Sequence, residues 1–210
     1  TSRKRLNMAL TRLHLCAKQI NKRHWNYNLL DIGCRTMDLK PLLAECYKYY
    51  GTDLLPPVEG VFQCNLENKL PFNDQQFDVV TALDILEHLN NPHDALQELY
   101  RVSKKTTYIS LPNMFYISFR MRFLFGGGIS GKYTFHANIV EDRHRWVLSY
   151  DEAIAFIEKN STQYRIKKTN ILPVRGRTKW IMEPLESLLA KLWPNTFVYG
   201  VLFEVIINEQ

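Results

Sequence analysis

Carboxylates and histidines with the chemistry of proton transfer or metal binding gather after one apolar run. The segment Asp84-Ile85-Leu86-Glu87-His88 directly follows the stretch 77–83, and a further histidine, His144, lies much later in the chain. Imidazole titrates near neutral pH, and mixed carboxylate and imidazole ligands suit Mg, Mn or Zn. We expect Glu87, His88 and His144 to converge as catalytic acid–base groups. A divalent metal is an alternative that the residues allow but do not favour, and a structural hydrogen-bonded cluster is another.

A second set of small and polar residues stands where short apolar runs end. Asp31, Gly33 and Cys34 close one run, Asp53 closes another, and Asn65 closes a third. In an open α/β sheet, ligands bind at the carboxyl ends of the strands. Gly33 permits close backbone approach, Asp53 is placed to accept both hydroxyls of a ribose, and Asn65 is placed to meet an adenine edge. The set therefore predicts a nucleoside site.

The elements that must position these residues alternate along the chain. Strands are expected at 28–33, 51–53, 61–64, 77–83 and 106–111, with helices at 38–50 and 92–102. Such alternation predicts βαβ units, an α/β fold and a mostly parallel sheet. Late strands at 164–172 and 197–208 flank a helix near 183–192, and the short link before the last strand favours an antiparallel strand there. Ser149 and Glu152 form a capping box that opens a helix to about residue 159.

An amphipathic helix is expected at about 3–24, before the first strand. Its apolar face carries Leu6, Leu10, Leu13, Ala17 and Ile20. Its other face carries Arg3, Arg5, Arg12, Lys18 and Lys22. We interpret the basic face as a solvated surface, with contact to a membrane or to RNA as the alternative.

Residues 114–148 break the alternation and are expected to form a lid-like insertion. The first part is rich in aromatic residues and methionine, and Gly126-Gly127-Gly128 suits a hinge. A fixed helix on the sheet edge is one alternative. Peripheral membrane contact is another, with Phe119, Phe123 and Phe125 in the lipid and Arg120 and Arg122 near the headgroups.

The composition is that of one globular domain over residues 1–210. The chain is 46% hydrophobic and 23% charged, with a net charge of +6, which excludes a disordered or collagen-like protein. The four cysteines form no CxxC pair, so we expect reduced thiols and neither disulfides nor a zinc site. We find no signal peptide or membrane span in the sequence and expect a cytoplasmic location.

The loop after the first strand discriminates between two nucleoside ligands. A dinucleotide site requires GxGxxG, whereas Gly33-Cys34-Arg35-Thr36-Met37-Asp38 has a single glycine. S-adenosylmethionine (SAM) has no phosphate and tolerates the poorer loop. SAM is therefore the favoured cofactor on this reading.

The order LLDIGC, YGTD, CNLENKLPFNDQQFDVVTALDILEHLNNPHDAL and ISLPN closely resembles the class I SAM-dependent methyltransferases. It looks most like their MetW-like and ubiquinone-biosynthesis branch. The resemblance implies a Rossmann-like three-layer sandwich whose seven-stranded sheet has one antiparallel strand near the C-terminus. It also implies SAM as cofactor and S-adenosylhomocysteine as product. By this resemblance, the cofactor contacts are Asp31, Gly33 and Cys34 for methionine, Asp53 for ribose, Asn65 and Leu66 for adenine, and Leu83 beside the sulfonium.

The resulting hypothesis is O-methylation of a small hydroxylated acceptor. The alternatives are a non-catalytic partner protein with the same fold and an RNA methyltransferase that uses the basic helix face. A protein partner fits either the enzyme or the partner hypothesis. The mild positive charge does not by itself indicate nucleic acid, so a nucleic-acid partner is not favoured. The glycine-poor loop GCRTM departs from the usual GxGxG and puts a large side chain, Arg35, where glycine normally stands.

Overall fold

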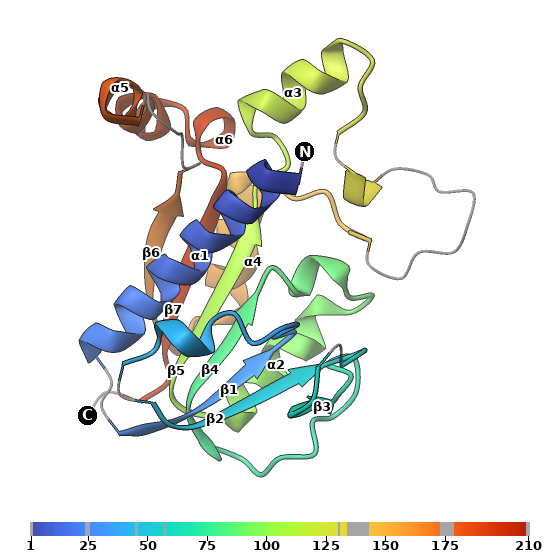
Figure 1. Ribbon diagram of the computed structural model, residues 1–210, viewed down its shortest axis with the longest axis vertical. Coiled ribbons are helices and arrows are strands. Elements are labelled where there is room, and N and C mark those ends of the chain that lie inside the picture. The colour runs from blue at the N-terminus through green and yellow to red at the C-terminus, as the bar shows by residue number, and fades with distance from the viewer. Residues whose placement is uncertain are drawn as a thin grey trace.

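The computed structural model describes residues 2–23, 26–44, 46–56, 58–129, 131–133, 143–172 and 179–208. In these residues seven strands form one sheet in the order β3-β2-β1-β4-β5-β7-β6 (Figure 1). The strands are β1 (Tyr27–Ile32), β2 (Cys46–Asp53), β3 (Val61–Gln63), β4 (Phe77–Leu83), β5 (Ser103–Pro112), β6 (Arg165–Ile171) and β7 (Gly200–Ile206). β7 is antiparallel to both of its neighbours, and the other neighbouring pairs are parallel. The predicted sheet, with one antiparallel strand near the C-terminus, is confirmed.

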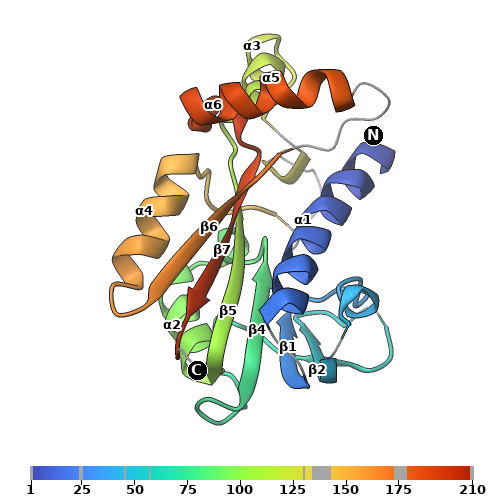
Figure 2. The ribbon, with the colours of Figure 1, turned by 90° about the vertical axis from the view of Figure 1, so that its left-hand side faces the viewer.

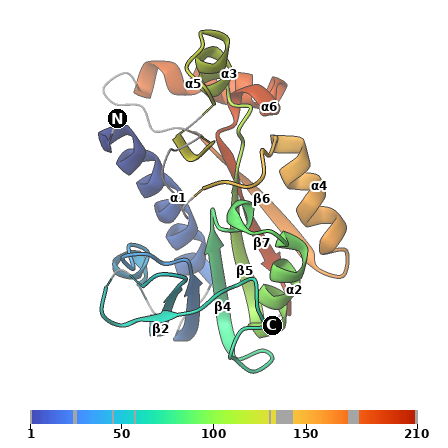
Figure 3. The same cartoon turned by 90° about the vertical axis from the view of Figure 1, so that its right-hand side faces the viewer.

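Helices cover both faces of the sheet and complete the three predicted layers. α1 (Ser2–Arg23) lies on one face, whereas α2 (Pro92–Val102) and α4 (Tyr150–Asn160) lie on the other (Figures 2 and 3). Side chains alternate along each strand, so β1 contributes to two cores. Leu30 packs in the core beneath α2 and α4, and Leu29 packs in the core beneath α1.

Three more helices lie at the carboxyl end of the sheet. α3 (Ile117–Leu124) follows β5, while α5 (Lys179–Leu192) and α6 (Pro194–Phe197) connect β6 to β7. All three views place these helices together at one end of the molecule. Of the proposed lid at 114–148, residue 130 and residues 134–142 lie outside the described residues.

The predicted helix at 38–50 is wrong. The structure has only a 3-10 helix, η1 (Lys40–Leu42), whose cap residue is Leu39 and not Asp38, and β2 already begins at Cys46. Cys46-Tyr47-Lys48-Tyr49-Tyr50 is rich in aromatic residues, which favour strands. Cys46 and the run from Lys48 to Thr52 pair with β1, with Leu30 opposite Tyr50. Pairing with β1 and the strand preference of these aromatic residues together outweigh the capping signal at Asp38.

Several other predictions are confirmed. α1 lies within one residue of its predicted bounds, and it buries Ala17 and Ile20 together with Cys16; the side chains of Leu6 and Leu10 lie outside the described residues. The Ser149–Glu152 capping box is present at the start of α4. All four cysteines are free thiols. Among the described helices, none combines the length and the apolar character needed to cross a bilayer.

Candidate active site

The predicted nucleoside-binding residues meet at the carboxyl edge of the sheet. After β1 the chain turns toward β2, and the amides of Gly33 and Cys34 both donate to the carbonyl of Thr52, at 2.8 and 3.0 Å. The amide of Arg35 donates to Asp53 Oδ2 at 3.1 Å. The Cys64 amide then donates to the carbonyl of Asp53, at 2.8 Å, which brings the next residue, Asn65, to the same edge. The structure thus places the predicted methionine, ribose and adenine contacts side by side.

The glycine-poor loop folds tightly in spite of its sequence. Gly33, Arg35 and Met37 all have positive φ, at 68°, 50° and 59°. A left-handed conformation costs a residue other than glycine about 1–2 kcal/mol, so the loop holds strain at Arg35 and Met37. The side chain of Arg35 is exposed and leaves the loop toward solvent. Arg35, which stands where glycine is usual, therefore strains the backbone, while its side chain stays outside the sheet.

Asp31 is buried at the end of β1, where both of its carboxylate oxygens accept hydroxyl groups. Tyr49 of β2 donates to Oδ2 at 2.5 Å, and Thr81 of β4 donates to Oδ1 at 2.6 Å. Burial raises the pKa of Asp31 from 3.8 to about 6, although the hydrogen bonds from Thr81 and Tyr49 act in the opposite direction and lower it. Asp31 thus joins three strand ends and lies among the groups expected at the methionine end of the cofactor.

A residue that the sequence reasoning placed on the solvated face of α1 belongs to this site. Arg12 turns inward and forms an ion pair with Asp84, just beyond β4. Asp84 has a φ of 55° and also accepts a hydrogen bond from Ser110 at 2.5 Å. The Arg12 Nε is buried and has no hydrogen-bond acceptor among the described residues. The solvated-face prediction is wrong for Arg12, because helical spacing cannot reveal a half-buried carboxylate contributed by a distant loop.

Three of the predicted cofactor residues have side chains that face the protein interior. Leu66 lies in the core beneath α2 and α4, and Leu83 lies in the core beneath α1. Cys34 is also buried, and burial raises the pKa of its thiol to about 12. Contacts from these residues to a cofactor would come from their backbone or from the edge of an apolar side chain. Asn65 Oδ1 accepts from the amide of Glu67 at 2.9 Å.

Glu87, His88 and His144 are brought together by the fold. The first two belong to a short 3-10 helix, η2 (Leu86–His88), and His144 comes from the segment before α4. One ligand atom from each residue lies within 4.8 Å of those of the other two. The His88 and His144 rings stack edge to face at 4.6 Å, and His144 Nε2 is 3.8 Å from Glu87 Oε1. The positions predicted to converge do so.

Glu87 is the most unusual group of this cluster. Its side chain is 0% exposed, and neither carboxylate oxygen has a hydrogen-bond donor among the described residues. Burial, with the nearby charge of Asp84, raises the pKa of Glu87 well above the usual range of a carboxylic acid. A carboxylate in this place requires a proton or a nearby cation, because an isolated buried charge is too costly.

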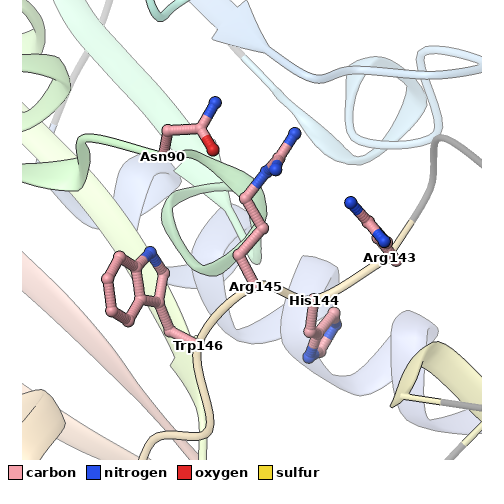
Figure 4. A pocket seen from close by; sticks show the side chains of 5 residues that line it. All are labelled: Asn90, Arg143, His144, Arg145 and Trp146. Atoms are coloured by element: carbon pink, nitrogen blue, oxygen red, sulfur yellow. The ribbon is translucent and has the colours of Figure 1, made fainter.

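The segment after His144 fixes the position of the cluster. The amide of Arg145 donates to the carbonyl of Glu87 at 2.9 Å, its Nε donates to the carbonyl of His88 at 2.8 Å, and the Trp146 indole donates to the carbonyl of Leu89 at 2.7 Å. An open cleft of about 520 Å³ adjoins the cluster and is lined by Asn90, Arg143, His144, Arg145 and Trp146. In Figure 4, Arg143 and Arg145 point away from the His144 ring.

Comparisons with known proteins agree with this fold. Residues 30–111 match a family model described as a methyltransferase domain. No curated protein sequence matches the chain at a significant level. One similar structure is a chain of the Haloferax volcanii complex between the Trm112 methyltransferase activator and a methyltransferase. It is 15% identical to this chain, with a TM-score of 0.58 over 97% of this chain and 92% of that one.

Two other solved structures have the same fold. A SAM-dependent methyltransferase of Thermotoga maritima is 16% identical, with a TM-score of 0.57 over 99% of this chain and 94% of that one. The small RNA methyltransferase HEN1 is 14% identical, with a TM-score of 0.64 over 96% of this chain and 26% of that one. The family model covers residues 30–111, and the structural similarity extends over nearly the whole chain, so the chain has the fold of the class I, SAM-dependent methyltransferases. The match and the fold support a methyltransferase, and a domain of this kind implies SAM as cofactor.

Replacing Asp31 by Asn should change how stability depends on pH. The raised pKa of Asp31 means that the folded protein holds this proton more tightly than the unfolded chain. Its stabilising effect is therefore present near pH 4 and is lost as the pH rises through about 6. Relative to Asp31→Asn, the wild type should lose about 2 kcal/mol of unfolding free energy between about pH 4 and 7.5, measured by urea denaturation. Parallel pH profiles for the two proteins would contradict this prediction.

Gly33→Ala should be far more destabilising than Gly60→Ala. Both glycines have positive φ, but an added Cβ at Gly33 would lie 2.1 Å from Ile85 Cδ1, whereas at Gly60 it would meet nothing within 4 Å. We expect an extra loss of about 1–3 kcal/mol for the Gly33 variant in denaturant unfolding, the usual cost of overpacking. Gly60→Ala controls for the backbone strain alone. Equal losses in both variants would show that the contact with Ile85 relaxes freely.

Proposed function

We propose that the protein transfers the methyl group of SAM to a hydroxyl oxygen of a small acceptor. The observation that carries this proposal is the convergence of Glu87, His88 and His144 on the same sheet edge as Asp53 and the loop after β1. An acid–base cluster next to a nucleoside site suits an acceptor that must lose a proton as it is methylated. Assignment to the MetW-like and ubiquinone-biosynthesis branch remains part of this proposal.

The residues at the strand ends fit SAM. Asp53 presents its carboxylate at the tip of β2, where its two oxygens now accept the backbone amides of Arg35 and Leu55. Ribose hydroxyls would use the same oxygens. The buried Nε of Arg12 is an unused donor beside Asp84, and it suits the carboxylate of the methionine portion. Bound SAM would supply an electrophilic methyl group on a positively charged sulfur.

The proposed roles of the cluster follow from its electrostatics. One imidazole, from His88 or His144, takes the proton of the acceptor hydroxyl, since an imidazole accepts protons near neutral pH. Glu87 lies 3.8 Å from His144 Nε2, so its carboxylate stabilises the imidazolium that forms. Removing the proton in the transition state typically contributes about 10²–10⁴-fold. Alignment of the acceptor oxygen with the methyl carbon contributes most of the remaining acceleration.

The same three side chains also fit a divalent cation. Their donor set of one carboxylate and two imidazoles suits Mg, Mn or Zn, and the buried Glu87 oxygens lack other donors among the described residues. A cation held by Glu87, His88 and His144 would lower the pKa of the acceptor hydroxyl. We treat this as the alternative to metal-free acid–base catalysis, and a chelator distinguishes the two.

An RNA acceptor is the second candidate, favoured by the cleft beside the cluster. Arg143 and Arg145 line it together with Trp146, a combination suited to a phosphate backbone and a stacked base. The fold is shared with the small RNA methyltransferase HEN1. Salt-dependent binding of a short RNA would support this candidate, because phosphate contacts release counterions. The non-catalytic partner hypothesis predicts instead that neither SAM nor S-adenosylhomocysteine binds.

Asp53→Ala should weaken SAM binding by about 1.5–3 kcal/mol, the value of hydrogen bonds to a charged group. Isothermal titration calorimetry with SAM and S-adenosylhomocysteine measures this loss. Asp38→Ala is the matched control, because Asp38 is an exposed carboxylate of the loop that follows Gly33. A folded Asp53→Ala variant with an unchanged dissociation constant would refute the ribose assignment.

His88→Ala and His144→Ala should each lower turnover at least about tenfold while leaving SAM affinity intact, because each removes a proton acceptor at the reacting oxygen. Turnover is measured with an acceptor found by screening hydroxylated compounds. His93→Ala serves as the control, since His93 lies on α2 and packs against Phe156 of α4. Loss of activity with a chelator would favour the metal alternative. Normal turnover of both variants, with and without chelator, would make the cluster structural.

A further inference from the structure

Basic residues are concentrated on two elements, α1 and β6. Together these elements hold ten of the 27 basic residues of the chain and none of its 21 acidic residues. The remainder of the chain therefore holds more acidic than basic residues, and the modest net charge of +6 conceals this separation. Such an asymmetry of charge is typical of proteins that bind a polyanion on one surface.

Contacts between α1 and the sheet bring part of this charge onto a single surface. Gln19 Nε2 donates to Thr169 Oγ1 of β6 at 2.7 Å. Arg23 forms an ion pair with Glu204 of β7. Glu204 is paired with Lys167 in the antiparallel ladder between β7 and β6. Because residues directly opposite each other in such a ladder share a face of the sheet, Lys167 lies on the face that α1 covers.

Four exposed cations surround these contacts. On α1, Lys18 and Lys22 are exposed. Lys22 is three residues from Gln19 and four from Lys18, so it shares a flank of the helix with both. On β6, Arg165 and Lys167 are exposed, and they lie on the same face because they are two residues apart. We call Lys18, Lys22, Arg165 and Lys167 the basic strip.

The surroundings of the basic strip favour a chain of anions over a bilayer. The one acidic residue of β7, Glu204, is only 5% exposed and is bound to Arg23. Within the described part of the chain, residues 12–23 of α1 and all of β6 contribute no exposed large apolar side chain. Binding in a bilayer interface requires such side chains. Residues four apart on a helix rise by about 6 Å, and residues two apart on a strand by about 6.6 Å, which suits regularly spaced anions.

We propose that the basic strip binds the phosphate backbone of a nucleic acid. The strip has no aromatic side chain that could stack on a base, so lysine and arginine contacts to phosphate carry the binding. Recognition is therefore independent of base sequence and of the sugar. The strip is separate from the cleft lined by Arg143 and Arg145, and the proposal does not depend on methyl transfer. The nucleic acid would lie along the helix that carries Arg12 to the candidate site.

Fluorescence anisotropy with labelled duplexes tests this binding. Duplexes of RNA and of DNA should bind the wild type with affinities within about threefold of each other, because both present the same phosphates. Four phosphate contacts predict that the logarithm of the binding constant falls with the logarithm of salt concentration with a slope of about −3 to −4. Lys22→Glu with Lys167→Glu should lower the affinity at least about tenfold and make the slope shallower by about 2. Lys18→Glu with Arg165→Glu is an independent second pair.

The matched control makes the same change of net charge elsewhere. Lys69→Glu with Lys159→Glu replaces two exposed lysines, one before β4 and one on α4 over the other face of the sheet. This variant should lose less than about threefold in affinity, since it changes only the overall field and no phosphate contact. Urea denaturation verifies that every variant is folded.

Several results would overturn the proposal. Neither duplex binds at about 50 mM salt, where phosphate contacts are strong. The strip and control variants lose affinity equally, or the RNA duplex binds and the DNA duplex does not. Arg143→Glu with Arg145→Glu abolishes binding while the strip variants bind normally, which would place the nucleic acid in the cleft. Vesicles with anionic lipid bind while duplexes do not, which would assign the strip to a membrane.

Calorimetry with SAM on the same preparations separates this proposal from the proposed function. Duplex binding through the strip without SAM binding supports the strip and rejects methyl transfer. SAM binding without duplex binding rejects the strip and leaves the proposed methyl transfer intact.

Discussion

The buried carboxylate of Asp31 is the constraint on which the site depends. It accepts hydroxyls from Tyr49 of β2 and Thr81 of β4, and so it ties three adjacent strands together near the carboxyl end of β1. Burial of this acid costs free energy, as its raised pKa shows. The cost is tolerated because it holds the strands in fixed register. The ends of these strands then fix the positions of the loop after β1, of Asp53 and of the turn after β4. Backbone pairing alone would leave those ends free to fray.

A second buried acid, Glu87, organises the turn after β4 in a different way. Its carboxylate has no hydrogen-bond donors among the described residues, but its backbone carbonyl receives the amide of Arg145. A hydrogen bond therefore holds the backbone of Glu87 in place, while its carboxylate can still bind a proton or a cation. Between the two acids lies the Arg12–Asp84 pair, which closes α1 over the sheet edge. Two acids and one ion pair thus stand along the edge where the cofactor and acceptor sites are proposed.

The class I methyltransferase fold is shared with proteins only 14–16% identical to this one. Such low identity is compatible with one fold because the sheet requires only buried apolar strands and a tight turn at Gly33. The glycine-poor loop shows how far the turn can vary. Arg35 and Met37 adopt positive φ at a cost, and Arg35 directs its side chain to solvent.

The sequence by itself determined the elements whose signals are local. β4 and α2 have their predicted bounds, and the Ser149 cap opens α4, because strand composition, a proline at a helix start and a capping box act within a few residues. The predicted strand ends also indicated that Gly33 and Asp53 lie close together, since the carboxyl ends of parallel strands stand at the same edge of a sheet. Tertiary structure alone decided that 46–50 is strand and that Arg12 faces inward. Both depend on partners far along the chain. Pairing with β1 outweighs the local capping signal before 46–50, and the Asp84 carboxylate draws Arg12 inward although helical spacing places it on the polar face.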